Sequence, residues 1–497
     1  MNKEEIIDYY NDLCELANEK LSRNSYRNLN PKYSTNLIEQ TWGTWTDFVK
    51  EASETLKLAR HTIIKKIGNT NKIVVTYIND GASVDLDCFL TLKNYAEFNN
   101  AELVVLWGKP LIKGKTFSNY EYEILGNYLA TSVETTKDKN IIIQDFLIPT
   151  SQKNPLLNLD KLSTDVKTIV VGATKQYLKI LPYKQYTSYR VGCSTGTIGE
   201  ISYNETVSGY IDNKYHTFGA ILLDWSDVDN RYKVRNLVYK NNCICDLTKK
   251  YTKNTIEDIK KVSGMVLGDL HLPDEDEDAL DATTSYLDLL KPEYVVIHDV
   301  ASWNSISHHE FNQHLSKVKN TTEDTLTLEI ELNSVLQRLK FFTSCFPDTK
   351  FRIVTSNHDY FINKFLEKGE FIKDSRNAII GAKLFIDYVQ DKDIFAGKLP
   401  NNIKTLPKNQ SFKVKGFELS EHGDSGISGA NGSINALSKT FSNCIIGHTH
   451  SPELKEDVVV VGTLSKLKLS YNQKGMTTWA HCNAVIYENG TAQLLFI

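Results

Sequence analysis

The sequence predicts an α/β protein in three parts: a small helical part at residues 1–65, an α/β part at 66–255 and a second α/β part at 256–497. The chain has 497 residues, which is too long for one ordinary hydrophobic core. Short apolar runs rich in β-branched residues alternate with helical patterns between residues 66 and 250. Beyond residue 260, five apolar runs each end in a short polar motif that contains histidine, which indicates where function lies.

Composition excludes several classes of protein. The chain is 41% hydrophobic and 24% charged, and its formal net charge of −4 argues against a large nonspecific nucleic-acid platform. Nucleic acid stays open as a substrate, because bound metal ions supply local positive charge. No apolar run approaches the roughly 18–20 residues that span a bilayer, the start lacks a signal pattern, and the eight cysteines include no CxxC pair. We therefore expect a soluble, cytoplasmic protein without a membrane partner.

Residues 1–65 are expected to be helical, because apolar residues recur at helical spacing in 4–21, 35–45 and 45–64. The element Trp42-Gly43-Thr44-Trp45 resembles small helical DNA-binding repeats of phage and homing-nuclease proteins. Basic and acidic residues are nearly equal in number here, so the electrostatic footprint of a DNA-binding module is missing. Packing or oligomerisation and DNA contact both stay open for this part.

The part at 66–255 should contain a largely parallel sheet. Helical patterns at 84–98 and 120–131 lie between several of its expected strands. These strands are 73–78, 103–107, 141–144, 168–171 and 218–223. The glycine-rich segment 192–199 matches neither a P-loop nor a dinucleotide fingerprint, which favours a turn-rich loop. The sequence does not indicate what this part does.

Helices and a hairpin are expected between and after the motifs of the third part. The acidic run 274–278 precedes a helix at 279–290 and suits its dipole as a solvated first turn. Leucines at helical spacing predict a core-facing helix at 325–345. The dipeptide Asn489-Gly490 lies between β-rich runs at 482–488 and 491–497, which predicts a tight hairpin.

Five polar motifs follow expected strands at 265–267, 294–297, 351–354, 417–419 and 444–446. The motifs are Gly268-Asp269-Leu270-His271, His298-Asp299, Ser356-Asn357-His358-Asp359, Glu421-His422-Gly423-Asp424 and Gly447-His448-Thr449-His450. Open α/β sheets gather ligands at the carboxyl ends of their strands. Ten of the twelve histidines lie after residue 270, and clustered imidazoles suit a metal site. Together these features predict a two-metal phosphoesterase site.

The motif set resembles the calcineurin-like metallophosphoesterase superfamily over residues 262–497. This resemblance implies that the third part is a metallophosphoesterase β-sandwich flanked by helices. It also implies a ligand set in which Asp299 bridges two metal ions. The first ion would be held by Asp269, His271 and His450, and the second by Asn357, His422 and His448.

The implied chemistry is phosphodiester hydrolysis by two divalent ions. Oxygen and imidazole ligands together suit Mn²⁺ best, with Mg²⁺, Fe or Zn²⁺ as alternatives. The ions would clamp the phosphate and lower the pKa of a bridging water, and the resulting hydroxide would attack phosphorus. His358 would act as the general acid, with Asp359 orienting its imidazole.

The sequence departs from the family pattern at two positions. His298 stands where the family has glycine, and Ser302 stands where it has aspartate or histidine. The second departure puts in doubt any role of that side chain in positioning the acid. His308 and His309 follow in the same loop, where they either contact phosphate or are simply exposed.

The block from His422 to Leu495 looks like phage-encoded early DNA-degrading metallophosphoesterases, relatives of the double-strand-break repair exonucleases. This implies a DNase that degrades host DNA in the cytoplasm of an infected cell. The glycine-rich stretch 423–433 would admit DNA, with Lys439 facing a phosphate, or is a flexible surface loop. A small-molecule phosphodiesterase or phosphatase, and a non-enzymatic takeover protein with a vestigial metal site, are the alternatives. We expect DNA as the partner and leave a homo-oligomer open.

Overall fold

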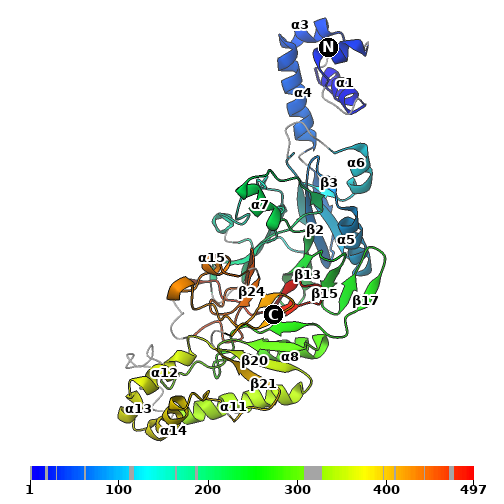
Figure 1. Cartoon of the computed structure of the whole chain (residues 1–497). Coiled ribbons are helices and arrows are strands. Elements are labelled where there is room, and N and C mark those ends of the chain that lie inside the picture. The colour runs from blue at the N-terminus through cyan, green and yellow to red at the C-terminus, as the bar shows by residue number, and fades with distance from the viewer. Residues whose placement is uncertain are drawn as a thin grey trace.

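The computed structural model is a mixed α/β protein (Figure 1). It describes residues 3–16, 21–29, 31–60, 63–110, 117–162, 165–184, 189–306, 327–395, 397–407, 410–441, 443–469 and 475–497. Within these ranges no helix is long and apolar enough to cross a membrane.

The N-terminal part contains four helices, in agreement with the helical prediction for it. Their apolar side chains form a separate hydrophobic cluster. The helices are α1 (Lys3–Leu16), α2 (Arg23–Asn28), α3 (Thr35–Trp42) and α4 (Trp45–Arg60). Ser34 caps α3 by accepting from the Leu37 N–H, and Gly43 ends it with a φ of +84°. The ring centroids of Trp42 and Phe48 lie 4.9 Å apart, so this tryptophan takes part in the packing. DNA contact by these helices stays a prediction.

A five-stranded sheet combines strands from both ends of the middle region. Its order is β14 (Arg231–Val238), β13 (Gly219–Ser226), β2 (Lys72–Asn79), β4 (Glu102–Gly108) and β5 (Leu129–Ala130). Helices α5 (Leu86–Phe98) and α6 (Asn119–Leu125) pack with its apolar side chains. The helix expected at 120–131 is too long, because Gly126 ends α6 and the next residues pair with β4.

An eleven-stranded mixed sheet runs through the centre of the molecule. Its order is β1 (Ile64–Ile67), β6 (Ser132–Thr135), β7 (Ile141–Gln144), β8 (Thr168–Val171), β11 (Arg190–Ser194), β9 (Leu178–Leu181), β25 (Glu453–Lys455), β26 (Val458–Val460), β24 (Cys444–Ile446), β23 (Phe417–Glu418) and β22 (Lys413–Val414). The middle region was expected to hold a largely parallel sheet, and its strands are instead mixed. Strands β7, β8 and β11 are parallel neighbours, as are β2, β4 and β5, whereas β6 with β7, β9 with β11, β2 with β13 and β13 with β14 are antiparallel. Strands β9 and β25 pair across the boundary expected at 255, with Leu178 opposite Leu454. The division into three parts stays a prediction.

The glycine-rich segment 192–199 is buried rather than a surface loop. Gly192 and Ser194 belong to β11, and Gly196 turns the chain with a φ of +75°. A side chain at Gly196 would approach the Thr217 carbonyl oxygen to 2.8 Å, so the close approach requires glycine. The prediction of a turn-rich loop at 192–199 is therefore wrong for the residues that belong to β11.

A six-stranded sheet packs against the central sheet. Its order is β21 (Ile403–Leu406), β20 (Lys350–Val354), β19 (Tyr294–Ile297), β18 (Gly264–Val266), β28 (Cys482–Ile486) and β29 (Ala492–Phe496). Val266, Val296 and Val354 face the central sheet and share a core with its residue Val459. Alternate residues face helices α8 (Glu277–Leu290), α11 (Leu328–Cys345), α12 (Asp359–Glu367) and α14 (Ala378–Val389). The result is two packed sheets with helices outside (Figure 1).

The structure contains the predicted C-terminal hairpin, whereas the acidic run 274–278 makes an ion pair that was not predicted. Strands β28 and β29 are antiparallel, and Gly490 has a φ of +73° in their turn, which confirms the predicted hairpin. Asp276 caps α8 by accepting from the Ala279 N–H. Glu275 instead pairs with Arg338 at 2.7 Å, so the run is more than a solvated first turn.

The remaining elements are short. They are β3 (Ser83–Val84), β10 (Tyr183–Lys184), β12 (Gly199–Glu200), β15 (Ile244–Asp246), β16 (Lys249–Tyr251), β17 (Ile256–Asp258), β27 (Met476–Thr477), α7 (Val207–Lys214), α13 (Glu370–Lys373), α15 (Ile434–Leu437), η1 (Leu159–Lys161) and η2 (Ile427–Gly429). Strand β10 pairs with β27, so a middle-region strand contacts the C-terminal segment that lies next to the site.

Candidate metal centre

The first two motifs stay side by side beyond the ends of β18 and β19. The Leu270 N–H donates to the His298 carbonyl at 3.2 Å, and the His271 N–H donates to the Asp299 carbonyl at 2.7 Å. These backbone bonds extend the parallel pairing of the two strands. They therefore fix Asp269 and His271 next to Asp299.

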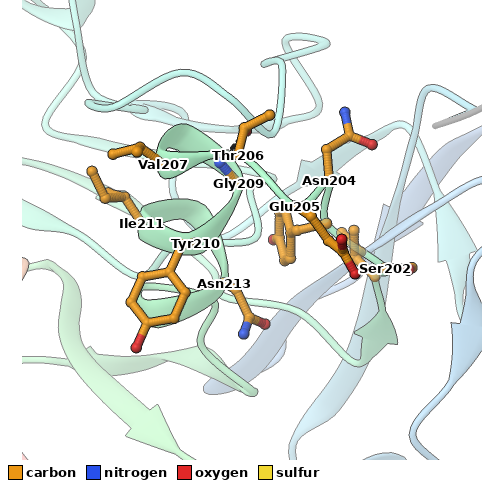
Figure 2. Close-up of a pocket in the computed structure, with 11 residues that line it drawn as sticks. Ser202, Asn204, Glu205, Thr206, Val207, Gly209, Tyr210, Ile211 and Asn213 are labelled. Atoms are coloured by element: carbon orange, nitrogen blue, oxygen red, sulfur yellow. Dashed lines mark hydrogen bonds between the residues drawn. The ribbon is translucent and has the colours of Figure 1, made fainter.

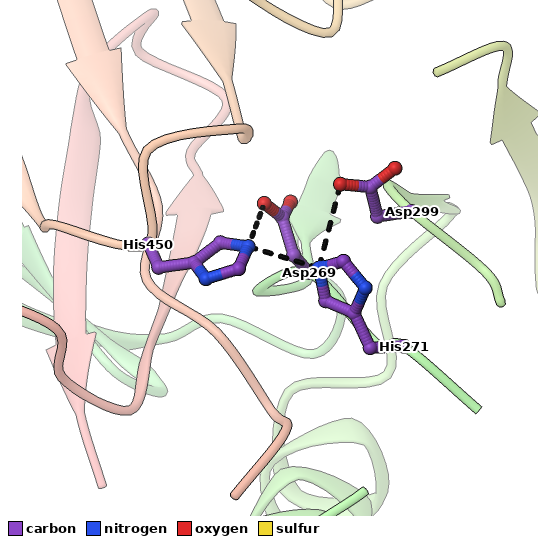
Figure 3. A group of neighbouring side chains, drawn as sticks. All are labelled: Asp269, His271, Asp299 and His450. Carbon is purple, nitrogen blue, oxygen red and sulfur yellow. Dashed lines mark hydrogen bonds and ion pairs between the residues drawn. The ribbon is translucent and has the colours of Figure 1, made fainter. Parts of the chain in front are cut away.

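Four buried residues form the first side-chain group: Asp269, His271, Asp299 and His450 (Figure 3). Their ligand atoms all lie within 4.8 Å of one another. His450 Nε2 lies 2.9 Å from His271 Nε2 and 3.1 Å from Asp269 Oδ2. Such a group could hold a metal ion, since imidazole and carboxylate are ligands of divalent transition metals.

A second group adjoins the first through Asp299. His422 Nε2 lies 3.1 Å from Asn357 Oδ1, and His448 Nδ1 lies 3.1 Å from the same oxygen. Asp299 Oδ2 lies 3.1 Å from His422 Nε2 and 3.4 Å from His271 Nε2. The structure thus brings all seven predicted ligand residues together, with Asp299 between the two groups.

The backbone is strained at four of these positions. The φ angles are +51° at His271, +40° at Asp299, +73° at His448 and +56° at His450. Residues other than glycine rarely adopt this left-handed region, and such strain concentrates at functional sites. A side chain at Gly447 would approach Asp269 Oδ1 to 2.0 Å, so glycine is required there. The local backbone is shaped to bring these side chains together.

The electrostatics of the centre favour ionised carboxylates and mixed histidine states. Burial raises the pKa of Asp299, but His422 and His271 outweigh this and hold it well below its ordinary value. Burial lowers the pKa of His271 to about 3, which leaves a neutral ring. Burial also acts to lower the pKa of His422, yet Asp299 outweighs it and raises that pKa to about 9.

Among the described residues, several buried atoms of the candidate centre lack a hydrogen-bond partner: Asp269 Oδ1, Asp299 Oδ1, His450 Nδ1 and His298 Nε2. An unpaired buried polar atom is costly, and more so when it carries charge. A divalent cation would satisfy the carboxylate oxygens, and the combined oxygen and imidazole donors suit such a cation. The residues present therefore fit a divalent metal centre.

His358 lies at the edge of the first group. Its ring centroid is 4.7 Å from that of His271, and its Nδ1 lies 3.3 Å from the Ser302 carbonyl oxygen. Asp359 was expected to orient His358, and this is wrong: Asp359 Oδ2 accepts from the Ser356 N–H at 2.9 Å and from Ser356 Oγ at 3.3 Å. No hydrogen bond joins His358 to Asp359 in the described structure. The physical reason is that Asp359 begins α12 and its carboxylate turns back to the strand end.

Ser302 contacts His358 through its backbone and not through its side chain. Its carbonyl faces His358, a role that any residue can fill, while its Oγ donates to Asp274 Oδ2 at 2.8 Å. Burial raises the pKa of Asp359 to about 6, against the opposing hydrogen bond from the Ser356 N–H. His308 and His309 lie outside the described residues.

Three neighbouring residues were given no role by the sequence. His298 Nδ1 lies 3.4 Å from His422 Nδ1. The ring of Trp479 lies 4.2 Å from that of His450. Glu331 of α11 accepts from the backbone of the loop that follows Asp299. Of these three residues, only His298 stood out in the sequence, because the family pattern has glycine at its position.

The glycine-rich stretch after His422 is a set of bonded turns. The Gly426 N–H donates to the Ala430 carbonyl at 2.6 Å, and the Gly432 N–H donates to the Asp424 carbonyl at 2.8 Å. A side chain at Gly432 would approach the Gly423 carbonyl oxygen to 1.8 Å. This argues for a compact segment over a flexible loop, and contact of Lys439 with DNA stays a prediction.

A cavity of about 700 Å³ lies elsewhere, around α7 (Figure 2). Its lining runs from Ile201 to Asn213 and includes none of the predicted site residues. Val207 and Tyr210 of α7 are 81% and 78% exposed, and polar side chains such as Asn204 and Asn213 also line this open surface. The candidate chemistry therefore lies at the metal centre and not in this cavity.

Comparison with known proteins gives one substantial sequence similarity. No family model matches the chain. It is 26% identical over 462 residues to Protein A1 of Escherichia phage T5, covering 85% of this chain and 81% of that protein. Among solved structures, nuclease MPE of Pseudomonas putida is 10% identical and aligns with 52% of this chain and 95% of its own, with a TM-score of 0.23.

Proposed function

We propose that the chain is a two-metal phosphodiesterase that cleaves DNA. The position of Asp299 is the observation that carries the proposal. Its Oδ2 lies 3.4 Å from His271 Nε2 in one group and 3.1 Å from His422 Nε2 in the other, and its Oδ1 is buried without a partner. One carboxylate placed between two sets of imidazoles suits a bridge between two cations.

The proposed ligand sets follow the two groups. Asp269, His271 and His450 would hold one ion, Asn357, His422 and His448 the other, and Asp299 would contact both. When bound, such ions polarise phosphoryl oxygens and supply a nucleophile at neutral pH. Mn²⁺ is the proposed native ion, because the donors mix oxygen and imidazole nitrogen.

His358 is the proposed general acid. Its Nδ1–H would donate to the Ser302 carbonyl, and the Nε2–H of the imidazolium form would be the proton that it delivers. The ring lies beside His271, so this proton would be available to a leaving oxygen at the centre. Asp359 is proposed to support the start of α12 through Ser356 and not to pair with His358.

We also propose that the substrate is DNA. It is supported by the resemblance of residues 422–495 to phage DNA-degrading metallophosphoesterases and by the similarity to a phage protein over most of both chains. The two packed sheets with helices outside agree with the β-sandwich that the resemblance implies. We further propose that the protein acts on host DNA in the infected cell.

The test is cleavage of linear and circular duplex DNA with Mn²⁺, with EDTA and His358→Ala as controls. We expect metal-dependent cleavage, lowered by about 10²–10⁴-fold in His358→Ala, the usual worth of a general acid, with metal content unchanged. Unchanged turnover would remove His358 from the mechanism. Intact DNA together with hydrolysis of bis-p-nitrophenyl phosphate would move the substrate to small phosphodiesters. Hydrolysis of neither, without bound metal, would favour the non-enzymatic alternative.

A further inference from the structure

His298 occupies a position where the family pattern has no side chain. Its imidazole is fully buried, and its Nδ1 lies 3.4 Å from His422 Nδ1. The ring centroids are 5.5 Å apart with an interplanar angle of 32°. The two nitrogens therefore face each other on the side of His422 that is turned away from Asp299.

The other nitrogen of His422 faces the centre. His422 Nε2 lies 3.1 Å from both Asp299 Oδ2 and Asn357 Oδ1. An imidazole that binds a metal through Nε2 must carry its proton on Nδ1, and that N–H needs an acceptor to fix the ring. Within the described chain, His298 Nδ1 is the acceptor placed to receive it. Carboxylates and carbonyls usually fill this role, so a histidine here is unusual.

The remaining atom of His298 argues against a simple packing role. When Nδ1 accepts from His422, the proton of a neutral His298 resides on Nε2, which is buried and has no partner in the part of the chain that the structure describes. An apolar side chain would fill the space without leaving a polar atom unpaired. A histidine at this position is explained if its Nδ1 is needed as the hydrogen-bond acceptor for His422.

We propose that His298 is a positioning residue that fixes the tautomer and the ring orientation of His422, so that Nε2 faces the second metal ion. The inference rests on the proposed metal function. It predicts that affinity for the second ion depends on an acceptor at the position of His298 Nδ1, while affinity for the first ion does not. His450, His271 and Asp269 contact one another without His298.

The test compares two substitutions of similar shape in the full chain. His298→Asn keeps a side-chain oxygen near the position of Nδ1, whereas His298→Leu has similar size and no acceptor. Mn²⁺ binding is measured by titration calorimetry, and the absorption of Co²⁺-loaded protein reports the ligand geometry. We expect His298→Leu to lose about 10–100-fold in affinity for the second ion, as is typical for lost outer-shell partners. His298→Asn should stay close to wild type, and the first ion should bind equally in all three proteins.

The possible results distinguish a failure of the inference about His298 from a failure of the proposed metal function. A wild-type protein that binds no Mn²⁺ overturns the proposed function and the inference with it. Two ions bound by wild type, with unchanged second-ion affinity in His298→Leu, overturns the inference alone. Equal weakening in the Asn and Leu variants also overturns it, because packing would then be the cause. If His298→Leu does not fold, as judged by thermal unfolding in EDTA, His298→Phe replaces it with a ring that lacks nitrogen.

Discussion

Asp299 is the residue on which both side-chain groups depend. Its carboxylate is buried, and neighbouring histidines hold its pKa well below the ordinary value against the opposing effect of burial. A negative charge is thus present at the point shared by the groups. An amide of the same shape would keep the packing and lose the charge that attracts two cations.

We therefore predict that Asp299→Asn weakens the binding of both metal ions, and not of one alone. The measurement is the metal content of the purified variant after equilibration with Mn²⁺, beside wild type. Asp281→Asn, on the exposed face of α8, is a matched control that should bind as wild type does. Two full equivalents of Mn²⁺ in Asp299→Asn would show that Asp299 is not the bridge.

At the scale of single residues, the sequence indicated which side chains come together better than it indicated what surrounds them. The family resemblance named Asp269, His422 and the other proposed ligand residues, and the structure places these side chains close to one another. The partner of His358 could not, because it is the backbone carbonyl of Ser302, and every residue has a carbonyl. The left-handed backbone at Asp299 was equally hidden, since it follows from tertiary contacts.

At the scale of elements, helix α11 holds the loop that carries the partner of His358. Glu331 accepts from the Asn304 N–H at 2.7 Å, and from the Ser305 N–H and Oγ at 3.1 and 2.6 Å. Burial raises the pKa of Glu331 from 4.5 to about 7, against these hydrogen bonds. The folded state thus binds this proton more tightly than the unfolded state does.

Because folding raises the pKa of Glu331, the free energy of unfolding depends on pH. The protonated Glu331 contributes stability that is fully present below pH 4.5 and is lost as the pH rises through about 7. We predict that the free energy of unfolding of wild type falls over this window relative to Glu331→Gln. Chemical denaturation in EDTA across these pH values measures it, with Glu329→Gln on the exposed face of α11 as the control. A constant difference between wild type and Glu331→Gln would refute the assignment.

The short strand pair of β10 and β27 connects the middle region to the centre. Tyr183 donates its hydroxyl to the Trp479 carbonyl, and the ring of Trp479 lies 4.2 Å from that of His450. The Ala480 N–H donates to the His450 carbonyl at 3.1 Å. A strand from the middle region therefore supports the segment that packs on a predicted ligand.

We predict that Tyr183→Phe weakens binding of the first metal ion without abolishing it. The loss of one buried hydrogen bond is worth about 0.5–1.5 kcal/mol, so the affinity should fall by up to about 10-fold. Calorimetric titration with Mn²⁺ measures this, and Tyr210→Phe on exposed α7 is the control. An unchanged affinity would show that Trp479 holds its place without Tyr183.

Element predictions failed where long-range pairing decides the outcome. Strand positions such as 168–171 and 294–297 agreed with the structure, because buried strands are continuous apolar runs. The excess length of the helix at 120–131 was not visible, since residues 129–130 are held as a strand by β4. Strand direction in the middle region was missed for the same reason.

At the scale of the whole molecule, the middle region and the region that carries the candidate site share one hydrophobic core. That core includes Val75 and Val170 from before residue 255 and Val296 and Ile445 from after it. The central sheet crosses the same boundary where β9 pairs with β25. The sequence could not reveal this continuity, because it shows where strands lie but not which distant strands become neighbours.

This shared core predicts how the chain responds to truncation. A fragment of residues 256–497 would leave β25 without its partner β9 and would expose apolar core residues to water. We expect it to be unfolded or aggregated, and to bind no Mn²⁺. A fragment of residues 61–497 loses only the helices that form their own cluster, so it should keep metal binding and unfold in a single transition close to that of the full chain. Circular dichroism during heating, with Mn²⁺ titration of each fragment, distinguishes these outcomes. A folded, metal-binding 256–497 fragment would show that the boundary at 255 separates independent domains.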